Sequence, residues 1–306
     1  MPIRKIAPII TIIVIAVLAV GITAVQQDDP FEEADVAVTI PPQAEHVEEL
    51  SDDLEVLVMI PPGEDPHHYE PEPERLQRLG TVDAYYKLGS GMEFEAEHME
   101  TLKEQNPEME IIDSSEGIEL IDIEHDHDHN DHEDDHNHND HDHDHEEGKD
   151  PHIWMSPNNT MTMINNLKEG LVEEFPNKEE IQNNADDYLN EWEELHGEIE
   201  NDLKPHENKT FMIYHPSMGY FAQDYNLNQM AIEIGGEEPG TQDLQNLIDR
   251  AKEENISTVF VSPQFPKEDA ETIATEIDGE VQQINPLEKE HLSNLTEISQ
   301  TLSDSL

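Results

Sequence analysis

Residues 54–79, LEVLVMIPPGEDPHHYEPEPERLQRL, predict a strand, a turn and a helix in succession. The apolar run at 54–60 predicts a buried strand, and the Pro-Pro-Gly at 61–63 ends it. A helix is then expected over Pro73–Leu79. A strand followed by a helix is the unit from which parallel α/β folds are built.

The same alternation recurs on both sides of this stretch. Short apolar runs predict further strands, and amphipathic segments between them predict helices. The strand candidates are Val36–Ile40, Tyr85–Leu88, Glu110–Ile112, Thr210–Tyr214, Ser257–Val261 and Glu280–Ile284, and the helix candidates are Glu45–Leu50, Leu244–Glu254 and Lys267–Glu276. This pattern indicates an α/β protein with parallel sheets.

The middle of the chain has a different pattern. Apolar residues recur at helical spacing through Asn158–Lys204, and Ala185–Leu203 predicts one helix of about 28 Å. The expected layout is therefore α/β lobe, long helix, α/β lobe. The predicted boundaries are 28–184 for the N-terminal lobe, 185–204 for the linking helix and 205–306 for the C-terminal lobe.

Charge sets this chain apart from an average globular protein. Its 306 residues include 73 Asp and Glu against 15 Lys and Arg, a net charge of −58, and only 35 % are apolar. Low hydrophobicity with high net charge usually marks disorder, but these acids are spread through segments with clear apolar periodicity. We therefore favour a folded, halophilic type of protein with an acidic surface. Nucleic acid is not an expected partner, because no basic patch can meet phosphate.

The N-terminus, residues 1–27, is predicted to be a signal peptide or a membrane anchor. Arg4 and Lys5 precede an uncharged stretch, Ile6–Val25, which is long enough to span a bilayer. The charge change from basic to acidic across it predicts that the rest of the chain lies outside the cytoplasm, at the cell surface. Cleavage stays open, so the protein is either membrane-tethered or secreted. Cysteine is absent, which excludes disulfides, thiolate zinc sites and a lipid-modified cysteine anchor.

Three histidines follow the ends of predicted elements. His67 comes after the strand at 54–60, His215 directly after the strand at 210–214, and His152 after a histidine-rich stretch. Ligands of open α/β sheets bind beyond the carboxyl ends of the strands, and neutral imidazoles bind Zn²⁺ tetrahedrally. Spacing alone leaves two interpretations open: one shared zinc site, or three separate surface or helix-capping residues.

Three motifs carry a resemblance to a known family. GEDPHHYEPEPERL at 63–76, DPHIWMSP at 150–157 and YHPSMGYFAQDYNL at 214–227 look like the signature segments of the zinc- and manganese-binding proteins of ABC importers, the ZnuA-like, cluster A-I family. The tail at 259–287, VFVSPQFPKEDAETIATEIDGEVQQINPL, is similar to that family's C-terminal strand–helix–strand. The resemblance runs from about Asp35 to Leu306.

The resemblance implies a fold, a metal and a partner. His67, His152 and His215 match the family's three metal histidines, bound between two α/β lobes that a rigid helix joins. A histidine in the third position is typical of zinc members, whereas a glutamate there goes with manganese, so Mn²⁺ is the less favoured ion. The implied function is extracytoplasmic capture of Zn²⁺ by a monomer that delivers it to the membrane permease of an ABC importer.

One position departs from the family pattern. The last strand-end motif is Asn285-Pro286-Leu287, where the family commonly has Asp-Pro-Leu. An amide oxygen is a weaker zinc donor than a carboxylate. The fourth ligand is therefore water, another carboxylate or the Asn285 oxygen, and Asn285→Asp is expected to tighten zinc binding if Asn285 faces the metal.

The stretch at 125–147 holds histidines among Asp, Asn and Glu and has no apolar residue, so a disordered loop is expected. Histidine-rich tracts bind transition metals, and we expect this one to collect or buffer Zn²⁺ weakly without being needed for the tight site. The alternative is a solvated acidic loop with no role. Its nine histidines are His125, His127, His129, His132, His136, His138, His141, His143 and His145.

The remaining expectations concern rival functions and other side chains. A metallohydrolase would need a general acid or base near the zinc, and no His-Glu-x-x-His motif occurs; a free-standing zinc buffer is the other rival. Trp154 is expected to pack beneath His152, and Tyr69 and Tyr220 to support the site or the core. We expect solvated side chains at His46, His98, His196, His206 and His291; His68 neighbours the first metal histidine but lacks its motif position, and a metal contact is its less favoured interpretation.

Overall fold

The computed structural model describes residues 34–123, 148–233, 236 and 238–306. All of them belong to one compact unit, residues 33–306. The predicted membrane segment Ile6–Val25 and the histidine-rich stretch 125–145 lie outside the described residues. Within the part that is described, no helix combines the length and the apolarity needed to cross a bilayer.

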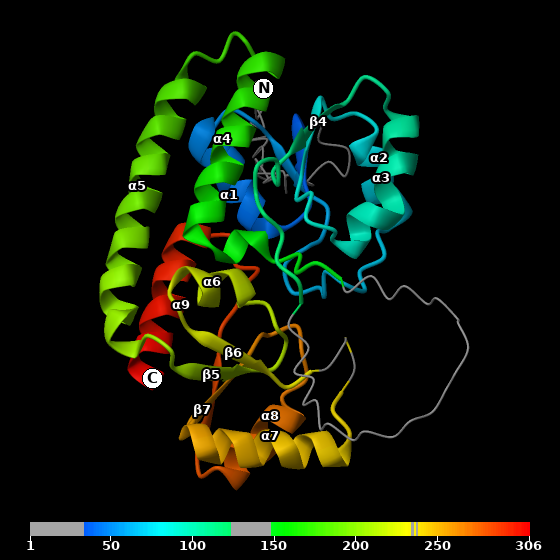
Figure 1. Cartoon of the computed structure of the whole chain (residues 1–306). Coiled ribbons are helices and arrows are strands. Elements are labelled where there is room, and N and C mark those ends of the chain that lie inside the picture. The colour runs from blue at the N-terminus through cyan, green and yellow to red at the C-terminus, as the bar shows by residue number, and fades with distance from the viewer. Residues whose placement is uncertain (1–33, 124–147, 234–235, 237) are drawn as a thin grey trace, which may run out of the picture. The chain divides into compact units, whose positions relative to one another are not determined.

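Two sheets of four parallel strands each form the centres of two lobes (Figure 1). Their strand orders are β2-β1-β3-β4 and β6-β5-β7-β8, so the two sheets have the same topology. The strands are β1 Val36–Val38, β2 Val56–Val58, β3 Ala84–Lys87, β4 Glu110–Asp113, β5 Thr210–Ile213, β6 Asn228–Ala231, β7 Thr258–Val261 and β8 Glu280–Gln283. The predicted class, two α/β lobes with parallel sheets, is confirmed.

Helices flank both sheets and connect the lobes (Figure 1). Most follow a strand, as the parallel topology requires. The helices are α1 Pro41–Leu50, α2 Pro73–Leu79, α3 Glu93–Gln105, α4 Pro157–Glu174, α5 Glu180–Leu203, α6 Gly219–Asp224, α7 Thr241–Glu254, α8 Glu268–Glu276 and α9 His291–Ser305, with short 3₁₀ turns η1 Ile153–Met155 and η2 Lys204–His206.

The linking helix is α5, which has 24 residues and begins at Glu180 rather than at the predicted Ala185. The extra turn forms because Ile181, which is fully buried, extends the apolar stripe of the helix toward its N-terminus. α5 packs against α1 and α4 of the N-terminal lobe and against α9 of the C-terminal lobe. One helix therefore contacts both lobes, which confirms the predicted long connection.

Four elements were not predicted: α3, α6, α9 and β6. β6 has the sequence NQMA and buries only Met230, so it lacks the apolar run that marks strands such as β5 and β7. α9 carries its buried residues among Ser, Thr and Asn, which weakens its helical pattern. Both elements form because the rest of the lobe supplies their partners, β5 for the strand and α5 for the helix.

His46 and His291 correct an expectation, because both side chains are fully buried rather than solvated. Nε2 of His46 on α1 lies 3.0 Å from Nδ1 of His291 on α9. Beside this pair, the backbone N–H of Leu292 donates to the Glu45 carboxylate at 3.1 Å. A carboxylate at the first turn of a helix is stabilising, so α1 of one lobe holds the start of the last helix of the other.

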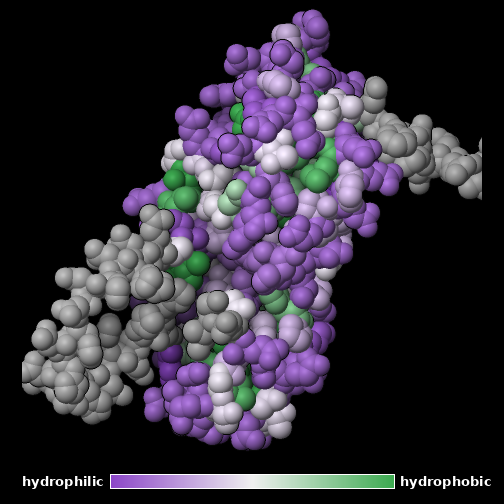
Figure 2. Space-filling model, turned by 90° about the vertical axis from the view of Figure 1, so that its right-hand side faces the viewer, coloured by the Kyte–Doolittle hydropathy of each residue, from purple (hydrophilic) through white to green (hydrophobic). Residues whose placement is uncertain are grey.

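The surface agrees with the acidic composition. Figure 2 shows a face on which hydrophilic residues predominate and hydrophobic residues are scattered. Among the described residues, Val172 is the exposed large hydrophobic side chain, at 41 %. The large apolar residues of the described part are therefore used mainly in its cores, as expected for a folded protein rather than a disordered one.

Candidate metal site

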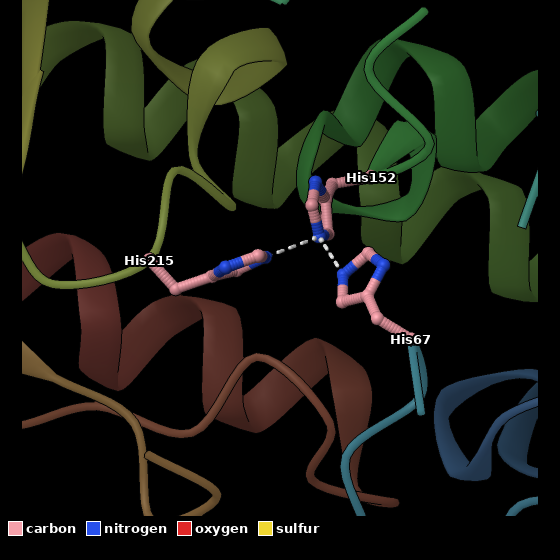
Figure 3. Close-up of side chains that lie close together, drawn as sticks. All are labelled: His67, His152 and His215. Carbon is pink, nitrogen blue, oxygen red and sulfur yellow. Dashed lines mark hydrogen bonds between the residues drawn. The ribbon is translucent and has the colours of Figure 1, made fainter. Parts of the chain in front are cut away.

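Three histidines meet where the strands of the two lobes end (Figure 3). His67 lies in the loop after β2, and His215 lies two residues after the end of β5. His152 stands directly before η1. The carboxyl ends of parallel strands share one edge of a sheet, so loops that are distant in sequence meet there. His67 and His152 come from the N-terminal lobe and His215 from the C-terminal lobe.

The spacing of the ring nitrogens suits a tetrahedral ion. Nε2 of His152 lies 3.3 Å from Nε2 of His67 and 3.2 Å from Nε2 of His215. The candidate ligand atoms of all three residues lie within 4.8 Å of one another. Two nitrogens bound to Zn²⁺ at 2.0–2.1 Å and at the tetrahedral angle are about 3.3–3.4 Å apart. The two shortest separations therefore already match those of zinc ligands.

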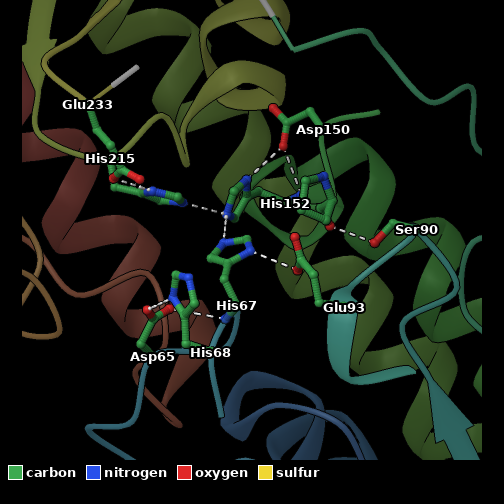
Figure 4. A network of polar contacts seen from close by, with 10 residues as sticks. Asp65, His67, His68, Ser90, Glu93, Asp150, His152, His215 and Glu233 are labelled. Atoms are coloured by element: carbon green, nitrogen blue, oxygen red, sulfur yellow. Dashed lines mark hydrogen bonds and ion pairs between the residues drawn. The ribbon is translucent and has the colours of Figure 1, made fainter. Parts of the chain in front are cut away.

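Each of these histidines has a carboxylate on its other ring nitrogen (Figure 4). The Nδ1 atoms of His67, His152 and His215 lie 2.8, 2.7 and 2.9 Å from oxygens of Glu93, Asp150 and Glu233. An Nδ1–H that donates to a carboxylate leaves the lone pair on Nε2, which is the arrangement that metal-binding histidines use. Three lone pairs then converge, and a cation placed between them would remove their mutual repulsion.

The sequence analysis missed this set of carboxylates, although a signal was available. Glu93 is the first residue of the helix that follows β3, and Glu233 comes two residues after the end of β6, so both follow strands of the sheets, as His67 and His215 do. Asp150 lies within the DPH motif, two residues before His152. What could not be read from the chain is which carboxylate pairs with which ring.

Backbone contacts hold the segment that carries His152. The Ser90 hydroxyl donates to the carbonyl of Pro151 at 2.6 Å, and the Tyr220 hydroxyl donates to the carbonyl of Asp150 at 2.9 Å. A Cβ on Gly219 would lie 2.5 Å from the Asp150 carboxylate, so this close approach requires glycine. The predicted supporting role of Tyr220 has this structural basis.

Aromatic rings pack against two of the imidazoles. Phe265 stacks on His215, with ring centres 4.6 Å apart and planes 15° apart. Trp154 lies 5.2 Å from His152, and its Nε1–H donates to the carbonyl of Pro286 at 2.8 Å. The packing expected of Trp154 is present, and its hydrogen bond also joins the two lobes beside the cluster.

Burial and charge shift the pKa values of two of these rings in opposite directions. Burial lowers the pKa of His152 to about 4, although Asp150 opposes this shift. Burial also lowers the pKa of His67, but the hydrogen bond and charge of Glu93, with Asp65 and Glu233, outweigh it and raise the pKa overall. At neutral pH His152 is thus held neutral, ready to bind a cation, whereas His67 binds a proton more readily.

The cluster opens into a cavity of about 880 Å³. His67, His152 and His215 line it together with Asp65 and His68. Residues at both described ends of the histidine-rich stretch also line it, and they are joined: Ile123 N–H donates to Gly148 C=O at 3.1 Å. The two described residues that flank that stretch therefore meet at this cavity.

Asn285, the fourth predicted position, has other partners. Its Oδ1 accepts hydrogen bonds from Gln264 at 3.1 Å and from the Leu287 backbone N–H at 3.2 Å. Its amide donates to Glu288 at 2.9 Å. Residues 264, 286 and 287 line a small space beside the three histidines, and Asn285 is not among its lining residues.

Comparisons with known proteins agree with this geometry. A family model described as "Zinc-uptake complex component A periplasmic" matches residues 36–304. The chain is 28 % identical over 265 residues to the high-affinity zinc uptake system protein ZnuA of Bacillus subtilis, an alignment that covers 85 % of this chain and 81 % of that one.

Two further matches widen the comparison. The chain is 28 % identical over 235 residues to the manganese-binding lipoprotein MntA of Halalkalibacterium halodurans, covering 74 % of this chain and 71 % of the relative. A crystal structure of ZnuA shares 35 % identity and a TM-score of 0.79, over 90 % of this chain and 99 % of that chain. With a family match over most of its length, the chain belongs to the zinc-uptake complex component A family.

Proposed function

We propose that this protein captures Zn²⁺ outside the cytoplasm and delivers it to the permease of an ABC importer. One observation carries the proposal: Nε2 of His152 lies at zinc spacing from Nε2 of both other histidines, and each of the three rings has a carboxylate on its opposite nitrogen. The family and the zinc-uptake relatives favour transport as the purpose of this binding.

The proposed ligands are His67, His152 and His215. For the fourth position, water or a carboxylate of the cavity is a better candidate than Asn285, whose Oδ1 already accepts two hydrogen bonds. Those bonds would have to break before the amide could turn toward the metal. An open fourth position also suits a carrier, because a ligand that is easily exchanged lets the ion leave.

The donor set favours zinc over manganese. Imidazole nitrogens suit Zn²⁺, whereas carboxylate and water oxygens suit Mn²⁺. The manganese-binding relative keeps Mn²⁺ as the alternative cargo. Glu93, Asp150 and Glu233 are the nearby carboxylates, and each uses an oxygen to hold a histidine.

Binding rather than catalysis is the proposed role of this zinc. A hydrolase would need a general base free to act on a metal-bound water. Here the carboxylates nearest the cluster are hydrogen-bonded to imidazole rings. Turnover of ester or phosphoester substrates by the zinc-loaded protein would support the rival function.

The remaining proposals concern topology and the loop. Residues 1–27 would export the chain and, if retained, tether it at the cell surface as a monomer, with 28–184 and 205–306 as the two lobes around the linking helix. The nine histidines of 125–145 would collect Zn²⁺ near the rim of the cavity. A free-standing buffer with the same loop is the alternative.

Transport is tested in the organism. Deleting the gene should reduce uptake of radioactive zinc when zinc is scarce, and the intact gene should restore uptake. A gene with His152→Ala should not restore it, although its product is exported. Normal zinc uptake with that variant would argue against the proposed function.

A further inference from the structure

His68 differs from its three neighbours in the cavity. It lines the same space as His67, His152 and His215, but its side chain is 75 % exposed, against 14 %, 6 % and 11 % for theirs. Figure 4 shows it beside Asp65, next to His67 and away from the point where the three rings meet. His68 is thus the histidine of this cavity that solvent reaches.

The ring of His68 is nevertheless held in place. Its Nδ1 lies 2.6 Å from one Asp65 oxygen, while the other Asp65 oxygen accepts the backbone N–H of His67 at 3.0 Å. The Nδ1–H that donates to Asp65 leaves the lone pair on Nε2, as in the three buried histidines. One carboxylate therefore connects an exposed, metal-ready imidazole to the backbone of the first proposed ligand.

We propose that His68 is a capture ligand, the first protein atom that an arriving Zn²⁺ binds before it passes to His67. This inference rests on the proposed function. A hydrated ion must exchange its waters for imidazoles one at a time, and the three buried rings offer little surface to it. A ligand at the mouth holds the ion close to the next one and raises its local concentration there.

A ligand used only in transit has a distinct kinetic signature. It lowers the barrier between solvent and the site, so it accelerates arrival and departure by the same factor. The dissociation constant, which is the ratio of the two rates, does not change. A resident ligand behaves differently, because its loss weakens affinity mainly through faster dissociation.

The test is stopped-flow kinetics on the full chain with His68→Gln. The ring centres of Trp154 and His152 lie 5.2 Å apart. A change in Trp154 fluorescence should therefore report zinc binding at the tight site rather than at the histidine-rich stretch. Association is followed with less than one equivalent of Zn²⁺, and dissociation by mixing the loaded protein with excess chelator. We expect the association and dissociation rates both to fall by about threefold or more, while the affinity for Zn²⁺ stays unchanged. This effect is smaller than the roughly 10²–10⁴-fold gain in affinity that two permanently linked binding sites can give.

Two further variants separate a metal contact from a structural effect. His206→Gln changes a histidine of η2 that does not line the cavity, and both rates should equal those of the parent. His68→Glu replaces the ring by a different metal donor and should restore much of the lost rate. The proposal is supported if His68→Gln slows zinc exchange and His68→Glu restores the rate.

Other outcomes overturn it. Unchanged rates in His68→Gln would make His68 an ordinary surface residue, and weaker affinity with faster dissociation would make it a resident ligand. No tight zinc binding by the parent chain would overturn the proposed function, and this inference with it. Equal rates together with tight binding would overturn the inference alone.

Discussion

Two groups of histidines in the described part of this chain are shielded from solvent, one in part and one fully, and they differ in what lies behind the rings. The metal cluster, His67, His152 and His215, has a carboxylate on every Nδ1. The buried pair, His46 and His291, has a ring-to-ring contact of 3.0 Å, and Nδ1 of His46 has no hydrogen-bond partner among the described residues. The pair is surrounded by aromatic rings, with Trp192 4.8 Å from His291.

The difference shows what turns buried histidines into a candidate metal site. Carboxylates orient the lone pairs toward one point and supply negative charge against the cation. Around the pair, burial is the main cause that lowers the pKa of both rings; the charge of His291 adds to it at His46, and at His291 a backbone hydrogen bond opposes it but the pKa still falls to about 3. The cluster also opens into a cavity that solvent reaches. We therefore expect the cluster to serve binding and the pair to serve the contact between lobes.

The largest effect should come from breaking the cluster. His152→Ala removes the ring whose Nε2 lies 3.3 and 3.2 Å from the Nε2 atoms of the other two, and zinc affinity should fall by more than about 100-fold, the upper range for losing a mere supporting group. Stability without metal should change little by comparison. Competition titration against a calibrated chelator measures the affinity, with His196→Ala, on α5, as the matched control.

Breaking the pair should give the opposite result. His46→Ala leaves the partner ring of His291 without its hydrogen bond and opens a cavity among aromatic side chains. We expect a loss of about 2–4 kcal/mol in the free energy of unfolding, with one tight zinc site retained. Denaturant unfolding in high salt gives the first quantity and zinc titration the second. A normal stability with a lost zinc site would reverse the roles assigned to the two groups.

The carboxylates can be tested one at a time. Asp150→Asn keeps the size of the side chain but weakens the acceptor for Nδ1 of His152, and zinc affinity should fall about 10–100-fold. Glu93→Gln should cost less, because Glu93 is half exposed, at 54 %, and water can replace it. Equal affinities of both variants and the parent would show that these carboxylates do not support the metal site.

The two groups of histidines should also differ in how they respond to pH. The raised pKa of His67 means that a proton competes with zinc already above pH 6.5, and affinity should then fall by at most about tenfold per pH unit for each proton displaced. The lowered pKa of His152, about 4, keeps that ring neutral until strong acid. NMR titration of the metal-free imidazoles should show His67 titrating above pH 6.5 and His152 near pH 4.

The buried pair, His46 and His291, should make the free energy of unfolding depend on pH. Its pKa values are lower in the folded state than the ordinary 6.5, so the unfolded chain takes up the proton first. The pair therefore contributes stability above pH 6.5, which is lost as the pH falls from there toward about 3. In the parent, acid should weaken zinc binding before it weakens the fold.

The sequence predicted the fold where local pattern and tertiary structure agree. The strand at 54–60 and the stripe from Ala185 to Leu203 are apolar enough to show their period. β6 and α9 were missed because each has few apolar residues in its sequence. β6 is stabilised by pairing with β5, and α9 by packing against α5. His46 carried a signal that was overlooked: Gln43, His46, Val47 and Leu50 recur at helical spacing and form the buried face of α1.

The three site histidines came from motifs, and their partners did not. Glu93 begins α3 and Glu233 lies after β6 in the other lobe, and chain order does not say which ring each one meets. Asn285 shows the converse. Its motif suggested a ligand, but the hydrogen bonds to Gln264 and Leu287 fix its oxygen locally, and such contacts exist only in the folded chain.

The smallest effect is expected at Asn285. Asn285→Asp should change zinc affinity by less than about twofold, or about 0.4 kcal/mol, because the new oxygen would keep the bonds that Oδ1 now accepts. It would also face the Glu288 carboxylate, to which the amide now donates. Competition titrations of the two proteins in high salt decide the matter. A clear gain in affinity would return this residue to the fourth position of the site.

One titration tests the central claim most directly. The chain without residues 1–27 and its triple variant His67→Ala, His152→Ala, His215→Ala are titrated with Zn²⁺ against a calibrated chelator at pH 7.5 in high salt, with circular dichroism to verify the fold. The parent should bind one Zn²⁺ tightly and further ions weakly, and the triple variant should keep only the weak binding. A tight site that survives in the folded triple variant would contradict the assignment of zinc capture to these three histidines.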